Sequence, residues 1–163
     1  MLNSIALGFG FSIAVLVYAT AHISGGHINP IVTFAFMLEK EISIQLGLLY
    51  MFAQFFGAWI GALLLWGCVA SLTSQCGDES AIYVSSVCQS SERSDGGYGP
   101  PFGLAANLVE SKVSVGSAFL LETMGSYLLV FVVLHTAYDK NSVAKNAAPI
   151  AIGWAVLLAH LGK

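Results

Sequence analysis

Long apolar runs separated by short polar segments dominate the chain. Residues 4–22 and 44–71 contain no charged side chain, and residues 116–138 contain one, that of Glu122. A helix needs about 20 predominantly apolar residues to cross the hydrocarbon core of a bilayer, so each of these runs is long enough. A fourth run, residues 147–161, is shorter. The pattern predicts four transmembrane helices.

A nine-residue apolar segment, residues 30–38, lies between the first two runs and is too short to span a membrane. It follows the turn "SGGHINP" and is closed by "EKEIS". Non-helical backbone at membrane depth is tolerated only where protein buries it or a wet cavity solvates it. We therefore expect a re-entrant half-helix. Residues 72–115, rich in Ser, Gly and Asp, predict a long loop after the second span.

Composition supports an all-α, multi-pass integral membrane protein. The 163 residues are 56% hydrophobic and 9% charged, whereas about a quarter of a soluble domain is charged. The first run lacks the preceding Lys or Arg and the cleavage pattern of a signal peptide. A net charge of −3 without a basic patch gives no indication of nucleic-acid binding. As location we favour the plasma membrane over an internal membrane.

Small and sulfur-containing residues suggest further contacts. Gly57 and Gly61 form a G-x-x-x-G pair, a pattern that lets membrane helices approach closely. Cys68 lies in an apolar run, where we expect a core thiol. Cys76 and Cys88 flank the polar loop and could pair if that loop faces an oxidising compartment.

Asn29 and Pro30 mark the start of the short helix. Asn is a strong N-cap, and its side-chain oxygen is expected to accept from the N–H of Ile31 or Val32. Pro is well suited to the first helical position, where its missing N–H would be unpaired. The Asn29 NH₂ group would then be free to meet a permeant molecule beside the positive end of the helix dipole. The alternative is that Asn29 and Pro30 merely cap a helix lying at the membrane interface.

A short internal similarity links the two halves of the chain. "YATAHISGGHINP" begins like "VLLAHLGK", so that His22 and His160 correspond. Inverted or repeated halves whose helix ends meet near the midplane are a recurrent transporter design. If the repeat is real, a second Asn-Pro helix is expected beyond Lys163, and a further helix before the first run.

These features together resemble the aquaporin (major intrinsic protein) family over nearly the whole chain. "GHINP" with "VTFA" resembles its first Asn-Pro-Ala half-helix, and "AQFFGAWIGALLL" its third transmembrane helix. "FLLETMGSYLLVFVV" and "APIAIGWAVLLAHL" resemble helices four and five. The resemblance implies that helix one, the second half-helix and helix six lie outside this chain. Ile31 departs from the alanine that usually follows Asn-Pro.

The resemblance also implies roles for individual residues. Phe9 and His160 would form the outer constriction, where a histidine favours water over glycerol. Gly25, Gly26, His27 and Ile28 would present carbonyl oxygens to the permeant, next to Asn29, Pro30 and Ile31. Glu122 and Gln54 would be buried structural polar groups. Glu122 would pin a re-entrant loop, and Gln54 would join helices. His22 and His135 would be structural.

These residues bear on several functional classes. The leading expectation is a passive, homotetrameric water channel that excludes ions and protons, with water as its permeant and no cofactor, metal or catalytic residue. The alternatives are a channel for glycerol or another small neutral solute, and a non-conducting partner subunit. A metalloenzyme using Glu122, His135 and His160 is disfavoured. Thirteen residues of helix separate Glu122 from His135 by ~20 Å, too far for a shared metal.

Overall fold

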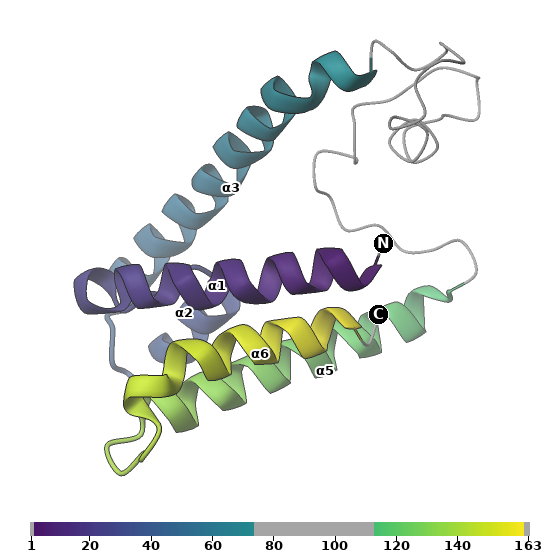
Figure 1. Ribbon diagram of the computed structural model, residues 1–163. Helices are drawn as coiled ribbons and strands as arrows, with labels where there is room; N and C mark the ends of the chain where they lie inside the picture. The colour runs from purple at the N-terminus through teal and green to yellow at the C-terminus, as the bar shows by residue number, and fades with distance from the viewer. Residues whose placement is uncertain (1, 74–112, 162–163) are drawn as a thin grey trace. The chain divides into compact units, whose positions relative to one another are not determined.

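All regular structure in the described part of the chain is helical. The computed structural model describes residues 2–73 and 113–161, and no strand occurs among them, which confirms the all-α prediction (Figure 1). Cys76 and Cys88 and most of the expected loop lie outside the described residues. The elements are α1 (Leu2–Ser24), α2 (Pro30–Leu38), α3 (Ile44–Thr73), α5 (Val115–Val133), the π-helical turn η2 (Leu134–Tyr138), the 3₁₀ turn η3 (Lys145–Ala147) and α6 (Ala148–Leu161).

Three helical segments are long and apolar enough to cross a membrane: Ser4–Ser24, Ile44–Cys68 and Val115–Tyr138. Most of their large apolar side chains are exposed within the chain, as expected of helices that face lipid or neighbouring protein. The helix α6 has 14 residues, fewer than the other three.

The chain divides into two compact units, and α3 belongs to both. One unit comprises Met1–Gln54 and Val109–Lys163, and the other Phe55–Leu108. In the second, among residues 55–73 that the structure describes, nothing beyond the nearby turns of α3 itself lies within 4 Å of a Cβ built on Gly57 or Gly61. Cys68 is exposed, so its expected core position is wrong. An apolar run identifies a membrane span but not which of its faces meets protein.

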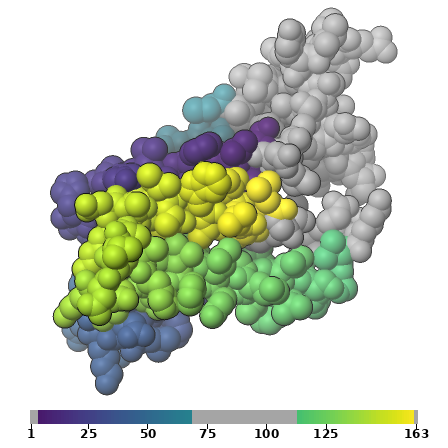
Figure 2. Space-filling view, turned by 60° about the horizontal axis from the view of Figure 1, so that its bottom comes forward, coloured from purple at the N-terminus to yellow at the C-terminus, as the bar shows by residue number. Residues whose placement is uncertain are grey.

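In the first unit, α6 lies between α1 and α5 (Figures 1 and 2). The helices α1 and α6 meet backbone to backbone at two glycines. A Cβ added to Gly153 would lie 2.5 Å from the Gly10 carbonyl oxygen and 2.7 Å from the Ala14 Cβ. A Cβ added to Gly10 would lie 2.8 Å from the Leu157 Cβ. Small residues at a crossing permit such an approach in membranes.

The short helix α2 is held against this unit by apolar packing. Its Val32 joins a buried cluster with residues of the three longer elements: Val17, Leu129, Val133, Ala148, Ile152, Ala155 and Val156. The hydroxyl of Tyr138 donates to the Glu41 carboxylate at 2.7 Å, which links η2 to the segment after α2. The core therefore lies where α1, α2, α5 and α6 meet.

Residues that directly flank α2 terminate the helix at both ends. At the C-terminus, the N–H of Glu41 donates to the Phe36 carbonyl and the N–H of Lys40 to the Met37 carbonyl. This is the Schellman arrangement, with Lys40 (φ 60°) in the left-handed position that glycine usually takes. At the N-terminus, Asn29 is the cap. Local bonds therefore set the length of this helix at nine residues.

Candidate functional site

The turn between α1 and α2 is built from left-handed backbone. Gly25 has a φ of 79°, Gly26 of 64° and Ile28 of 50°. Glycine adopts this region freely, whereas an L-residue such as Ile28 incurs roughly 1–2 kcal/mol. Strain of this kind persists only where the surrounding structure enforces it, and it clusters at functional sites. The turn runs directly into Asn29.

Asn29 caps α2 as predicted. Its backbone is extended (φ −141°, ψ 128°), and its Oδ1 accepts from the Ile31 N–H at 3.0 Å. Its main-chain carbonyl accepts the first helical bond, from the Thr33 N–H at 3.1 Å. Pro30 occupies the first helical position. Both oxygens of Asn29 thus accept hydrogen bonds within the described chain. The hydrogens on its side-chain Nδ2 are the donors that remain to meet a ligand.

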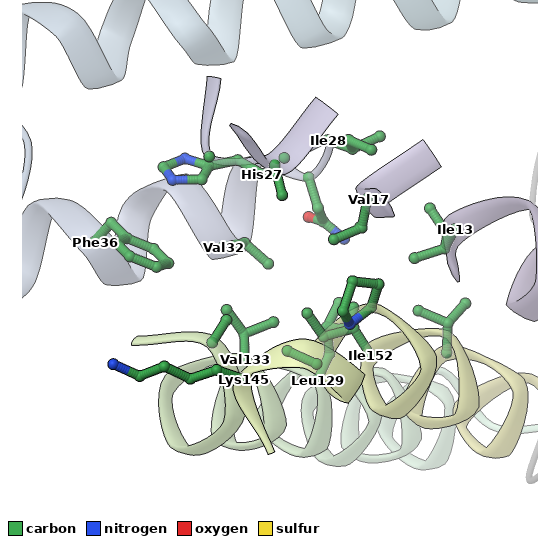
Figure 3. A pocket seen from close by; sticks show the side chains of 18 residues that line it. Ile13, Val17, His27, Ile28, Val32, Phe36, Leu129, Val133, Lys145 and Ile152 are labelled. Atoms are coloured by element: carbon green, nitrogen blue, oxygen red, sulfur yellow. The ribbon is translucent and has the colours of Figure 1, made fainter. Parts of the chain in front are cut away.

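A cavity of about 210 Å³ lies beside this turn. His27, Val32 and Phe36 face Leu129, Val133 and Lys145 across it (Figure 3). Polar side chains on its wall come from His27, Asn29 and Lys145. The rest of the lining is glycine or apolar: Ile13, Val17, Ala21, Gly25, Gly26, Ile28, Val32, Phe36, Leu129, Val133, Ala137, Ala148, Pro149, Ile152 and Val156.

The two glycines of the turn are expected to differ in their tolerance of a side chain. A Cβ on Gly26 would lie 3.2 Å from the Ala21 Cα, which is backbone, whereas one on Gly25 would meet only the His27 ring at 3.2 Å. Both positions have positive φ. We expect Gly26→Ala to destabilise by about 2–3 kcal/mol and Gly25→Ala by about 1 kcal/mol. Thermal unfolding in detergent would measure this, and equal shifts would show that the crowding at Ala21 is relieved.

Phe9 and His160 lie together although they are far apart in the sequence. Their rings stack with centroids 4.5 Å apart and an interplanar angle of 17°. The His160 Nδ1 lies 2.9 Å from the Val156 carbonyl, and because a carbonyl only accepts, Nδ1 carries the hydrogen. The Nε2 of a neutral ring is then an acceptor. The pair lies one helical turn beyond Ile13 and Val156 on the cavity wall.

The two expected buried polar groups differ. Gln54 is partly buried, and its Nε2 donates to the Thr33 hydroxyl at 2.9 Å, which joins α3 to α2. Glu122, by contrast, is exposed, so the structure does not bury it as expected. It lines an open groove of about 510 Å³ between α2 and α5 together with Ile31. The groove is formed by residues of α2 and α5, and its open side leaves the Glu122 side chain exposed.

The remaining histidines lie outside the cavity. His135 stacks on Phe131 at 4.1 Å and its Nδ1 donates to the Phe131 carbonyl at 2.8 Å, while His22 is exposed. Within residues 2–73 and 113–161, no three His, Cys, Asp or Glu side chains are grouped to hold a metal ion.

Sequence reasoning missed two contributions to the site. Thr33 is fully buried and bonds to three residues around the turn. The sequence could have indicated this role, because Thr33 follows the capping Asn29 by four residues and a helical Thr often bonds the carbonyl of residue i−4. The second contribution is the opposite cavity wall of Leu129, Val133 and Ile152. These residues resemble any other apolar positions of a span, and no pattern distinguishes them.

Helices able to span a bilayer, combined with a short capped helix that ends at a cavity among them, define an integral α-helical membrane protein with several spans. The sequence profile of the family described as Major intrinsic protein matches residues 1–163. The chain belongs to this family, the aquaporin family.

Curated relatives support the same assignment. The chain is 37% identical to aquaporin PIP2-4 of Zea mays, with 96% of this chain and 47% of the relative covered. It is 35% identical to an aquaporin PIP-type of Atriplex canescens, with 98% and 49% covered. It is 34% identical to aquaporin PIP2-1 of Arabidopsis thaliana, with 96% and 47% covered. The chain thus spans about half the length of the curated relatives that it matches.

Proposed function

We propose that the protein is a passive channel that conducts water across a membrane. The observation that carries the proposal is the Asn29 cap, whose amide hydrogens remain available at the wall of an otherwise mainly apolar cavity. A helix start presents positive potential, which attracts a water oxygen and disfavours cations. The curated relatives bear the name aquaporin, which supports the same activity.

Within this proposal each residue of the site has a role. Asn29, Pro30 and Ile31 form the half-helix start, and the carbonyls of Gly25, Gly26, His27 and Ile28 accept from passing water. Phe9 and His160 form the narrow region, and Gln54 holds the half-helix to α3. Glu122 is a structural acceptor that pins a re-entrant loop. The assembly is a homotetramer in the plasma membrane.

Osmotic water flux tests the proposal. Vesicles containing the purified protein should shrink faster than protein-free vesicles when stopped-flow mixing raises the external osmolarity, and they should pass no ion current. A rate equal to that of bare lipid would reject conduction and favour the alternative of a non-conducting partner subunit.

Within this proposal, His160 is the residue that makes the channel selective for water over glycerol. Because its ring stacks on Phe9, His160→Gly should widen the narrow region and raise glycerol permeability by about tenfold, an amount that corresponds to about 1.4 kcal/mol. His135→Gly is a matched control, since His135 also bonds the carbonyl four residues earlier and stacks on a phenylalanine. Vesicle swelling in a glycerol gradient measures both. Glycerol permeation through the unchanged protein would instead favour the neutral-solute channel.

A further inference from the structure

The Thr33 hydroxyl is the centre of a buried hydrogen-bond network behind the Asn29 turn. The Thr33 side chain is 0% exposed. Its Oγ1 lies 3.3 Å from the Asn29 carbonyl oxygen, 3.2 Å from the His27 Nδ1 and 2.9 Å from the Gln54 Nε2. Three segments therefore meet at one oxygen: the turn, α2 and α3.

The direction of each bond follows from the chemistry of its atoms. The Asn29 carbonyl only accepts, so the Thr33 hydroxyl donates its single hydrogen there. The Gln54 amide and the His27 Nδ1 must then donate to the two lone pairs of Thr33. This assigns the Nδ1–H tautomer to His27. It also fixes the Gln54 amide, because a flipped amide would bring its oxygen to a hydroxyl with no hydrogen left to give.

Ring contacts hold His27 in the place that the network needs. The imidazole stacks on Phe36 of α2, with centroids 4.6 Å apart, and meets Tyr50 of α3 edge-on at 5.5 Å. A threonine in a helix commonly bonds the carbonyl four residues earlier, and that habit alone would explain the bond to Asn29. It does not explain two donors from other segments that converge on the same oxygen.

We propose that Thr33 is the positioning residue of the site: its hydroxyl fixes the Asn29 turn against α3, and the permeability of the channel depends on that bond. This inference rests on the proposed function for its transport consequence. With Thr33 in place, the Asn29 carbonyl accepts from both the Thr33 N–H and the Thr33 hydroxyl. The carbonyl therefore cannot rotate toward the cavity, and the amide hydrogens of Asn29 keep their direction.

Two substitutions of Thr33 separate hydrogen bonding from packing. Thr33→Val keeps the shape of the side chain but removes the hydroxyl. It leaves the part-buried donors of His27 and Gln54 without this acceptor, while the Asn29 carbonyl keeps only its bond from the main-chain N–H of residue 33. Thr33→Ser keeps the hydroxyl but removes a buried methyl group. Water permeability per folded molecule should fall by about tenfold in Thr33→Val, and Thr33→Ser should retain most of it. The reverse order would overturn the proposal in favour of packing.

Control and coupled variants sharpen this test. Thr136 makes the same bond to the carbonyl four residues earlier, at 2.7 Å, on η2, and Thr136→Val should leave permeability within about twofold. Gln54→Met removes the donor to Thr33 from a side chain that is only partly buried, so it serves where Thr33→Val does not fold. The water permeability of the Thr33→Val/Gln54→Met double variant should be no lower than that of the less permeable single variant. Each single substitution already removes the same bond, the one between Gln54 and Thr33. Additive losses would overturn the proposal.

Hydrogen exchange reads out positioning without transport. In detergent, the amides of residues 25–29 and 31 should exchange faster in Thr33→Val than in Thr33→Ser, while those of α1 stay unchanged. Equal exchange in the two variants would overturn the positioning role even if permeability fell. If the unchanged protein conducts no water, the proposed function fails, and the exchange measurement still decides whether Thr33 holds the turn.

Discussion

Replacing Gly153 with alanine is expected to lower the melting temperature of the protein by about 10 °C. The added Cβ would lie 2.5 Å from the Gly10 carbonyl oxygen and 2.7 Å from the Ala14 Cβ, so α1 and α6 would have to separate. Overpacking of this kind costs about 3 kcal/mol, and each kcal/mol shifts the midpoint by roughly 2–4 °C in a chain of this size. Heating in detergent followed by size-exclusion chromatography measures the loss.

Gly8 provides the matched control for this substitution. It lies on α1 two residues before Gly10, and nothing occurs within 4 Å of a Cβ built there. Gly8→Ala should therefore change the free energy of unfolding by no more than about 0.5 kcal/mol. If Gly153→Ala and Gly8→Ala have the same melting temperature, α1 and α6 do not require backbone contact at this crossing.

The second large effect is expected at Asn29, where structure and transport can be separated. Asn29→Asp keeps a good N-cap and places a negative charge at a helix start, which is favourable, but it removes the amide donors. Water permeability should fall by about tenfold or more, while the melting temperature holds or rises. Stopped-flow flux and thermal unfolding of the same preparation test both statements.

Asn29→Ala removes the cap as well as the donors. Its permeability should fall equally, and its stability should drop by about 1 kcal/mol. A preparation of Asn29→Asp that conducts like the unchanged protein would contradict the role assigned to the amide hydrogens. An Asn29→Ala protein as stable as the original would instead contradict the importance of the bond between Oδ1 and the Ile31 N–H.

The helical architecture and the Asn29 cap could be predicted because both depend on local sequence. Apolar runs free of charge identify spans, and an Asn-Pro pair before an apolar segment identifies a helix start. The helix α1 nevertheless extends to Ser24, and α5 continues into a π-helical turn at Leu134–Tyr138. Helix ends depend on bonds that the hydrophobic pattern does not encode.

Tertiary contacts were predicted less well, because one sequence does not reveal which small or polar residues meet. The G-x-x-x-G pattern pointed to Gly57 and Gly61, whereas the close crossing occurs at Gly10 and Gly153. Gly10 and Gly153 lie in separate helices and form no such pattern, and only the packing of α6 against α1 brings them together. Glu122 was expected to be buried because a membrane span disfavours a carboxylate. In the structure it is exposed at a groove.

The direction of the bonds around Thr33 has a consequence for proton leakage. A side-chain relay beside the cavity would have to pass a proton from the His27 ring to the Thr33 hydroxyl and on to the next acceptor. That acceptor is the Asn29 main-chain oxygen, an amide carbonyl that is a very weak base and has no hydrogen to hand on. Any reversal would require the hydroxyl to rotate and break its bond. The hydrogen-bonded groups that hold the turn therefore cannot relay a proton beyond the Asn29 carbonyl. They support the half-helix without providing a proton pathway beside the cavity.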